Sequence, residues 1–260
     1  MNDAYSDSIA KWRDERLAAL TAEDGWLNLT DRVAIVPGRM TIGSDPQNDV
    51  QISAGPGHLG TLELSADGNA TFDDGQAQHQ FQRVPDNPPR LKTGGLLLEV
   101  TQVEGAFALR VRDIGAASRK AFPGIESYST DPEWRIEADW IPLDEPQDVE
   151  IDLVTGARDR VRITHQAEFT HEGQVVTLLP THEKSGKPMF VIRDRTAGRE
   201  TYGAARFLIG EVSGDKVVLD FNKAFSPPCA FTEFAVCPLP VAQNIMPFEI
   251  RAGEKKPADH

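Results

Sequence analysis

Residues 158–169 read RDRVRITHQAEF, and from Val161 onward apolar and polar positions alternate. Successive side chains of a β-strand point to opposite faces, so Val161 and Ile163 share one face with His165, whereas Arg162 points the other way. The stretch therefore predicts a strand with one buried side and one solvent-facing side. It places His165 on the buried side.

The same two-residue period recurs along most of the chain after Trp26, interrupted by Gly and Pro pairs that are typical of hairpin turns. We predict strands near residues 32–36, 39–42, 60–64, 70–72, 96–103, 106–112, 135–141, 149–154, 158–169, 174–179, 189–194, 204–211, 216–222 and 248–251. Short strands at this spacing are typical of barrels and sandwiches. The predicted fold class is mostly β, with a C-terminal antiparallel β-barrel or sandwich.

One amphipathic helix is predicted near the N-terminus, because Ile9, Trp12, Leu17 and Leu20 recur at roughly helical spacing among charged residues. We expect it to be structural, with Trp12 and Leu20 buried against β structure. The expected organisation is an N-terminal helix (1–25), a turn-rich β subdomain (26–113), an irregular connection (114–132), a C-terminal β domain (133–252) and a frayed tail (253–260).

The chain of 260 residues carries 40 acidic and 27 basic side chains, a formal net charge of −13. This excess disfavours nucleic acid and anionic membranes as partners. There is no signal peptide or membrane-spanning apolar run, and two cysteines are too few for a disulfide scaffold, so we expect a cytoplasmic protein. No phosphate loop, dinucleotide fingerprint or zinc motif occurs, and we expect no cofactor and no metal. The oligomeric state is left open.

The C-terminal third contains a series of uncommon residues in a characteristic order. It comprises Thr201-Tyr202-Gly203-Ala204, Val218-Leu219-Asp220-Phe221-Asn222, Pro227-Pro228-Cys229-Ala230-Phe231, Cys237-Pro238-Leu239-Pro240, Asn244 and Ala252-Gly253-Glu254-Lys255. This series resembles the bacterial and archaeal family known as domain of unknown function sixteen-eighty-four (DUF1684), and the resemblance covers roughly residues 90–255. The family name implies no activity. Phe225-Ser226 departs from the family's Tyr-Asn, and no arginine follows Asn244.

An earlier segment, Gly38-Arg39-Met40-Thr41-Ile42-Gly43-Ser44 followed by Asn48-Asp49, resembles the opening of a forkhead-associated phosphopeptide-binding domain, over residues 38–64. Such a domain reads phosphate with an arginine after the Ile-Gly pair and with Ser-Arg before a histidine. Here Ser44 stands at the first place, and Gly55-Pro56-Gly57 precedes His58. A turn-rich β-hairpin without phosphopeptide binding is the alternative.

The strand predicted at 216–222 places Asp220 and Asn222 together on the face opposite its apolar residues. If a three-residue loop (213–215) joins this strand to the preceding one, Arg206 lies opposite Asn222. We favour that loop length because an arginine that is buried without a partner is very costly. The resulting cluster could orient a carboxylate or carbonyl group of a ligand, and a purely structural ion pair is the alternative.

Cys229 and Cys237 lie in loops that neighbouring prolines stiffen. Small buried packing residues are one interpretation, and a thiol nucleophile or a metal or redox role are others. Their spacing is not that of a zinc knuckle or a short redox pair. His165 and His171 are too far apart on one strand to share a metal, although His182 from another strand could add a ligand.

The leading hypothesis is that a pocket in the C-terminal β domain binds a small polar or anionic organic ligand. The expected ligand-binding residues are Tyr202, Arg206, Asp220, Asn222, Cys229, Cys237 and Asn244. One alternative is an enzyme, for example a hydrolase, that uses the same pocket with Cys229 or His165 as the reactive group. Another is a protein-interaction module that acts through the forkhead-like segment.

Overall fold

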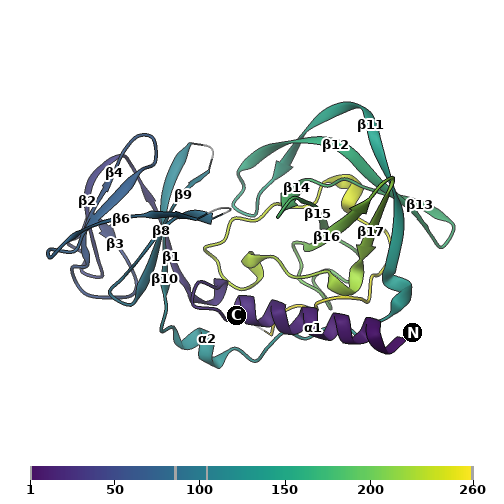
Figure 1. Cartoon of the computed structure of the whole chain (residues 1–260), viewed down its shortest axis with the longest axis horizontal. Coiled ribbons are helices and arrows are strands. Elements are labelled where there is room, and N and C mark those ends of the chain that lie inside the picture. The colour runs from purple at the N-terminus through teal and green to yellow at the C-terminus, as the bar shows by residue number, and fades with distance from the viewer. Residues whose placement is uncertain (1, 85–86, 104, 259–260) are drawn as a thin grey trace. The chain divides into compact units, whose positions relative to one another are not determined.

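The computed structural model describes residues 2–84, 87–103 and 105–258, and the chain divides into two compact units. The inserted unit is Ala19–Phe122, and the split unit combines Met1–Ala18 with Pro123–His260. Figure 1 labels the elements along the chain, beginning with helix α1 at Asn2–Leu20. The predicted mostly β fold with an N-terminal helix is confirmed. No helix in the described ranges is both long and apolar enough to span a membrane.

The inserted unit contains two five-stranded sheets. One has the order β1-β10-β9-β8-β7, built from Leu29–Ile35, Ala106–Asp113, Leu96–Val103, Asn87–Thr93 and Gln82–Val84. The other has the order β3-β2-β4-β5-β6, built from Val50–Gln51, Gly38–Gly43, Gly60–Leu64, Ala70–Asp73 and Gln78–Gln80. β2 and β3 are parallel, whereas the other described pairs in this unit are antiparallel.

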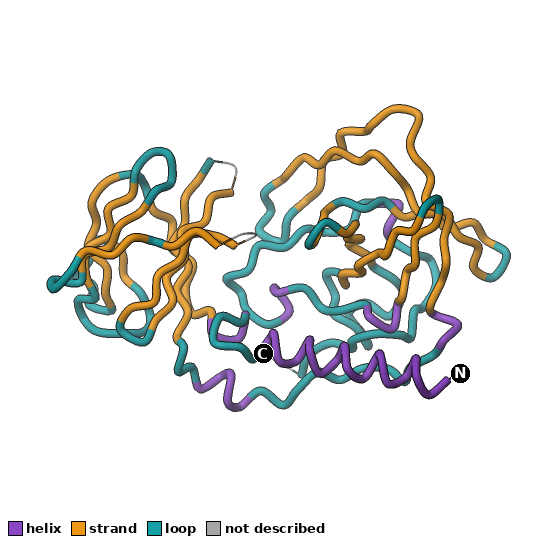
Figure 2. Tube along the Cα trace, viewed as in Figure 1, coloured by secondary structure: helices purple, strands orange, loops and turns teal. Residues whose placement is uncertain are grey.

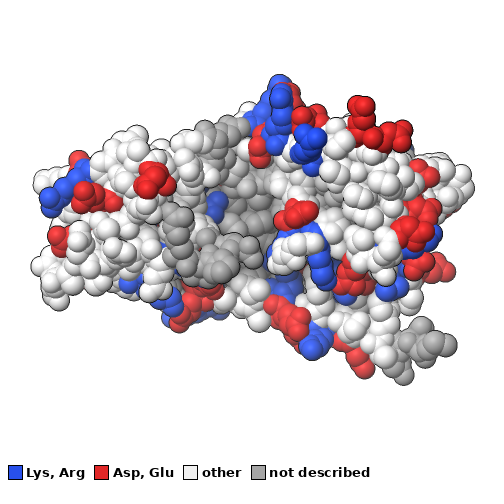
Figure 3. All heavy atoms as spheres, turned by 45° about the horizontal axis from the view of Figure 1, so that its top comes forward, with Lys and Arg blue, Asp and Glu red and all other residues white. Residues whose placement is uncertain are grey.

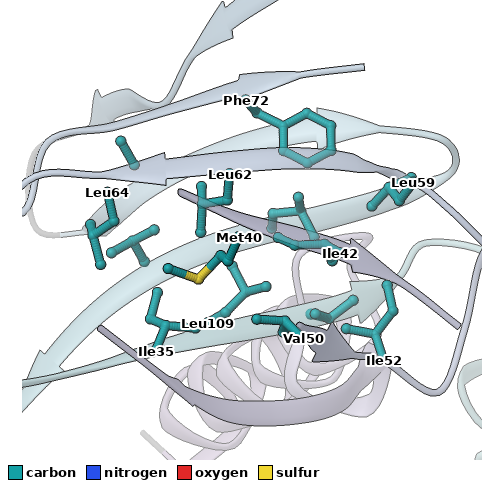
Figure 4. Close-up of a cluster of buried hydrophobic side chains, with 14 of the residues drawn as sticks. Ile35, Met40, Ile42, Val50, Ile52, Leu59, Leu62, Leu64, Phe72 and Leu109 are labelled. Carbon is teal, nitrogen blue, oxygen red and sulfur yellow. The ribbon is translucent and has the colours of Figure 1, made fainter. Parts of the chain in front are cut away.

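One hydrophobic core joins these two sheets. Figure 4 shows Ile35 and Leu109 of the first sheet beside Met40 and Leu62 of the second. Alternating positions of β2, β4, β9 and β10 point into this core because side chains on a strand repeat every two residues. Two short helices, η1 at Trp26–Asn28 and α2 at Ala117–Ala121, complete the described elements of this unit.

The split unit contains a seven-stranded antiparallel sheet with the order β13-β12-β11-β17-β16-β15-β14. Its strands are Gln174–Leu178, Arg158–His171, Arg135–Asp152, Lys216–Asp220, Arg206–Ser213, Lys187–Ile192 and His182–Lys184. The described strands do not close into a barrel. Alternation along β12 is as predicted, because Ile163, Ala167 and Phe169 are buried while Arg162 and Thr164 are exposed.

Three predictions about strands are wrong. The strands predicted at 135–141 and 149–154 are one strand, β11, which stays paired with β12 across an irregularity between Pro142 and Gln147. Residues 248–251 are not a strand. The short strands β3, β6, β7, β8 and β14 were not predicted, because runs of two to seven residues rich in polar side chains carry little period-two signal.

After β17 the split unit consists mainly of loop, as Figure 2 shows, with single 3-10 turns at η3 (Phe221–Lys223), η4 (Pro228–Ala230) and η5 (Ala242–Asn244). A further single turn, η2 (Pro132–Trp134), precedes the sheet. Helix α1 lies against this segment. Its Ile9 is fully buried, and Arg16 pairs with Glu254 at 3.0 Å. Leu20 is buried as predicted, but Trp12 is only half-buried, with its ring 6.4 Å from that of Phe225.

The first part of the expected frayed tail is bound to the split unit. The Glu254 side chain is 1% exposed, and the backbone N–H groups of Lys255 and Lys256 donate to the carbonyl oxygens of Glu126 and Glu200. The tail prediction is therefore wrong up to Lys256. The sequence of the tail carries no apolar residue beyond alanine, which is typical of a frayed end, but its backbone finds hydrogen-bond partners.

Candidate functional site

Arg206 lies at the start of β16, and its side chain is 2% exposed. Its guanidinium donates to the Asp194 carboxylate at 3.2 Å and to the carbonyl oxygens of Ile250 and Ala252. Burial lowers the pKa of Arg206, and the charge of Asp194 opposes that shift. Asp194 also accepts the backbone N–H of Ile250 at 2.7 Å. Arg206 therefore ties β16 to the C-terminal segment.

The predicted cluster of Arg206 with Asp220 and Asn222 is wrong in its pairing. Ser213 pairs with Lys216, so the hairpin turn has two residues instead of the predicted three. The ladder between β16 and β17 also ends at Gly210 and Leu219, before it reaches Arg206. Arg206 pairs across the sheet with Ile192 of β15, on its other side.

Asp220 and Asn222 do lie together, in contact with Tyr5 of α1. The Tyr5 hydroxyl donates to Asp220 at 2.8 Å, and the Asn222 amide donates to that hydroxyl at 3.0 Å. The Asn222 side chain also exchanges two hydrogen bonds with the backbone of Asp131. Burial, followed by the hydrogen bond to Asp220, raises the pKa of Tyr5. These contacts anchor the helix. They also occupy polar atoms of Asp220 and Asn222 with which a ligand would have to bond.

Asn244 is fully buried and joins three backbone groups. Its amide nitrogen donates to the carbonyl oxygens of Leu179 and Val191, each at 2.9 Å, and its amide oxygen accepts the N–H of Leu179 at 2.8 Å. These bonds link the segment after β13 with β15. The geometry places Asn244 in the framework of the split unit.

Tyr202 and Cys229 line a cavity of about 370 Å³ together with Gly203, Thr232, Glu233 and Lys256. The Tyr202 hydroxyl donates to the Cys229 carbonyl oxygen at 2.9 Å. Burial raises the pKa of Tyr202, and the neighbouring Cys229 adds to the shift. Cys237 lies behind Cys229, whose N–H donates to the Cys237 Sγ at 3.3 Å. Of the seven expected ligand-binding residues, Tyr202 and Cys229 line this cavity, and Cys237 lies behind them.

A second cavity of about 450 Å³, which we call the histidine pocket, is lined by Trp140, Arg162, Thr164, His165, Thr181 and His182, with Glu183 and Val212 among its other residues. It joins β12 to β14, which lie far apart in the strand order, so the sheet must curve strongly. The irregularity of β11 lies opposite Thr164. Bulges bend a strand and redirect side chains, which explains how both Thr164 and His165 reach one cavity.

The histidine pocket has an ordered aromatic wall. The His165 ring stacks on Trp140 with a centroid distance of 4.9 Å and an interplanar angle of 3°. Trp140 in turn meets Phe190 of the core edge-on. The Nδ1 atom of His165 lies 2.9 Å from the Thr164 hydroxyl, and that of His182 lies 3.0 Å from the Thr181 hydroxyl. Burial lowers the pKa of His182, although Asp159 acts in the opposite direction.

Comparison with known families places the chain clearly. Residues 120–255 match the family described as protein of unknown function, DUF1684. The chain belongs to this family. An uncharacterized protein of Haloarcula marismortui, solved in solution by NMR, is 28% identical, with a TM-score of 0.44, over 55% of this chain and 82% of that chain. No match to a curated protein was found.

The DUF1684 match confirms the predicted resemblance over residues 120–255 and contains the whole histidine pocket. It also contains most of the residues around the Tyr202 cavity, apart from Lys256 and Pro257. No described group of three or more His, Cys, Asp or Glu side chains is arranged to hold a metal ion. Candidate chemistry in the DUF1684 region therefore rests on the two cavities.

The forkhead-like segment lies outside the DUF1684 match, in the inserted unit. The Ser44 hydroxyl donates to the Gly55 carbonyl oxygen at 3.1 Å, and His58 contacts the Asn48 amide oxygen at 3.0 Å. These bonds hold the loops that follow β2 and precede β4. Phosphopeptide recognition by this segment stays a prediction.

Proposed function

We propose that the split unit binds a small anionic organic molecule in the histidine pocket. The observation that carries the proposal is the position of Arg162. Arg162 lines the cavity, and no carboxylate in the described part of the chain forms an ion pair with it, whereas Arg160 on the same strand face pairs with Glu150. The acid opposite Arg162 on the neighbouring strand is Asp148.

The other polar groups in the pocket suit the same ligand class. Thr164 and Thr181 supply hydroxyl groups, and the two imidazoles supply ring nitrogens. Guanidinium and hydroxyl donors recognise carboxylate and phosphate oxygens through charge-assisted hydrogen bonds. Glu183 is the acid that lines the cavity. The pocket thus concentrates donors in a protein whose formal net charge is −13.

Exposed charges elsewhere on the protein do not cancel this local preference. On the face shown in Figure 3, acidic and basic side chains are interspersed. A ligand is then selected by the pocket itself, because interactions between exposed charges are largely screened beyond about 10 Å at ordinary ionic strength. The size of the cavity, about 450 Å³, lies within the range of small-molecule sites. The stacked Trp140 and His165 rings favour a ligand with a planar part.

Catalysis in the same pocket is the second candidate function, and His182 is the observation that favours it. Burial lowers its pKa, so the imidazole is neutral at neutral pH, as a general base requires. The Thr181 hydroxyl holds one ring nitrogen, which orients the other. A hydrolytic reaction of a bound anionic substrate would use this base to activate water.

Native mass spectrometry of protein purified without added ligand tests for a co-purified small molecule. Calorimetric titration with benzoate, inorganic phosphate and uncharged benzamide then tests the ligand class. We expect benzoate or phosphate to bind and benzamide not to bind. Arg162→Met should weaken anion binding by roughly tenfold or more, because a hydrogen bond to a charged group contributes about 1.5–3 kcal/mol.

The matched control is Arg160→Met, which removes the same charge from the same strand face outside the cavity. It should leave anion affinity nearly unchanged. Equal losses in the two variants would show that only the overall charge matters, and the proposal would then be wrong. The absence of any anion binding to the wild type would also contradict it.

A further inference from the structure

Two cysteines lie next to each other at the Tyr202 cavity: Cys229 lines it, and Cys237 lies behind Cys229. The Cys229 N–H donates to the Cys237 Sγ at 3.3 Å, which holds the second thiol against the residue that carries the first. Neither cysteine is part of a disulfide. Because the Cys237 Sγ contacts the backbone N–H of Cys229, the two sulfur atoms are separated by little more than one cysteine side chain, and local side-chain motion can bring them to the S–S bond length of about 2.0 Å.

The two cysteines differ in their access to solvent. Cys229 is half-buried and lines the cavity, whereas Cys237 is 2% exposed. A small oxidant that enters the cavity therefore meets Cys229 first. Cys237 is placed to react only with what has already formed on Cys229.

The backbone holds both cysteines in position. The N–H of Val154 donates to the Cys237 carbonyl oxygen at 2.9 Å, so the turn that follows β11 fixes the second cysteine. Tyr202 fixes the first, through its hydrogen bond to the Cys229 carbonyl oxygen. Pro228 precedes Cys229 and Pro238 follows Cys237, and a proline locks its own φ angle. These contacts keep the two cysteines adjacent, so the sulfur atoms can approach each other without any rearrangement of the sheet.

We propose that Cys229 and Cys237 form a peroxide-sensitive dithiol that closes reversibly to a disulfide. The Cys229 thiol loses its proton, and the thiolate attacks one oxygen of a hydroperoxide. The O–O bond breaks, and the departing alkoxide or hydroxide takes up one proton and leaves as an alcohol or water. Cys229 is now a sulfenic acid. The Cys237 sulfur attacks it, the S–O bond breaks, water leaves with the Cys237 proton, and the S–S bond forms. The two cysteines lose two electrons and the peroxide gains them. An external dithiol restores the starting state by disulfide exchange.

The electrostatics of the site support this order of events. The hydrogen bond with Cys237 lowers the pKa of the Cys229 thiol, and the contact with Tyr202 acts in the same direction, against the opposing effect of burial. A lower pKa raises the thiolate fraction, which is the reactive form. The dithiol needs neither Arg162 nor any other residue of the histidine pocket. The dithiol proposal is therefore independent of the proposed function, and each can be tested without the other.

The test uses the full chain, fully reduced and then freed of reductant without air. Addition of one equivalent of hydrogen peroxide should remove both titratable thiols and lower the intact mass by two hydrogen atoms. Peptide mapping should find one intramolecular Cys229–Cys237 link, and dithiothreitol should reverse it. Retention of both thiols at peroxide levels that oxidise free cysteine, or a disulfide between two chains, would overturn the proposal.

Two variants assign the order of attack. Cys237→Ser should accumulate a sulfenic acid at Cys229 that dimedone traps, and Cys229→Ser should leave Cys237 at least tenfold slower to oxidise. A faster reaction at Cys237 would overturn the order. If either variant fails to fold, limited alkylation of the wild type with iodoacetamide gives the same information. We expect label on Cys229 before Cys237, and the reverse order contradicts the proposal.

Discussion

The Arg206 guanidinium and the Asp194 carboxylate form an ion pair at 3.2 Å in which each side chain is 2% exposed. Desolvation of two charges offsets much of their attraction, so such a pair adds little net stability by itself. Loss of one partner is different, because the other charge then remains buried without compensation. The pair therefore allows a direct test of the framework around β16.

Arg206→Met should lower the free energy of unfolding by about 3–5 kcal/mol, because the Asp194 carboxylate loses its buried partner. Chemical denaturation measures this change. The matched control is Arg199→Met, whose arginine is 62% exposed and pairs with Glu249, and it should cost less than about 1 kcal/mol. Equal effects of the two substitutions would contradict the account of Arg206.

Helix α1 should contribute to stability through Ile9. Ile9→Ala should lower the free energy of unfolding by about 2–5 kcal/mol, because it removes a fully buried side chain and leaves a cavity. Lys11→Ala, at an exposed position of the same helix, is the control and should change stability little. An unchanged denaturation midpoint for Ile9→Ala would show that the helix is loosely attached.

Asn244 should be structural. Asn244→Ala leaves the N–H of Leu179 and two carbonyl oxygens without their partner, at a cost of about 1–3 kcal/mol for each buried group. Thermal unfolding measures the loss, and Gln243→Ala at the neighbouring exposed position is the control. If Asn244→Ala kept full stability but changed ligand retention, the original expectation of a ligand-binding Asn244 would be restored.

All three tyrosines should titrate above their ordinary pKa of 10.0 in the folded protein. Burial, followed by the hydrogen bond to Glu200, raises the pKa of Tyr128 to about 12. The folded state then holds protons that the unfolded state releases, so this contribution is complete below pH 10 and is lost as pH rises toward 12.

Ultraviolet absorbance of tyrosinate during an alkaline titration checks this prediction. The folded protein should ionise its tyrosines at higher pH than the same protein in denaturant. Tyr128→Phe should make stability less sensitive to pH in that window, since phenylalanine has no proton to release. Coincident titration curves for the folded and denatured protein would contradict the assigned burial.

The period-two pattern predicted most of the fold because it depends on neighbouring residues alone. The burial of alternate residues on β12 follows directly from RDRVRITHQAEF. Register between strands depends instead on turn geometry, and the two-residue turn at Gly214 and Asp215 cannot be told from a three-residue one by alternation. The extra residue in the predicted turn shifts the register, and this shift placed Arg206 opposite Asn222, which it does not contact in the structure.

The candidate site was harder to predict for a related reason. The cost of burying a charge predicts that Arg206 has an acidic partner, and the structure shows that this partner is Asp194. The sequence pattern placed Asp194 at the end of a predicted strand, whereas it lies just after β15 and carries no local sign of this role. Arg162, Trp140 and His182 come from three strands, and only the curvature of the sheet brings them to one cavity. His165 alone carried a local signal, an imidazole at an apolar position.

The discontinuity of the split unit has a consequence for how the protein is made. Helix α1 leaves the ribosome more than 200 residues before the partners of its polar side chains, because Tyr5 binds Asp220 (215 residues later) and Arg16 binds Glu254 (238 residues later). The inserted unit, 19–122, is complete long before those partners appear. The apolar side chain of Ile9 therefore remains exposed to solvent until the segment around Asp220 and Glu254 has been synthesised. We expect a ribosome-associated chaperone to bind the nascent helix during this interval.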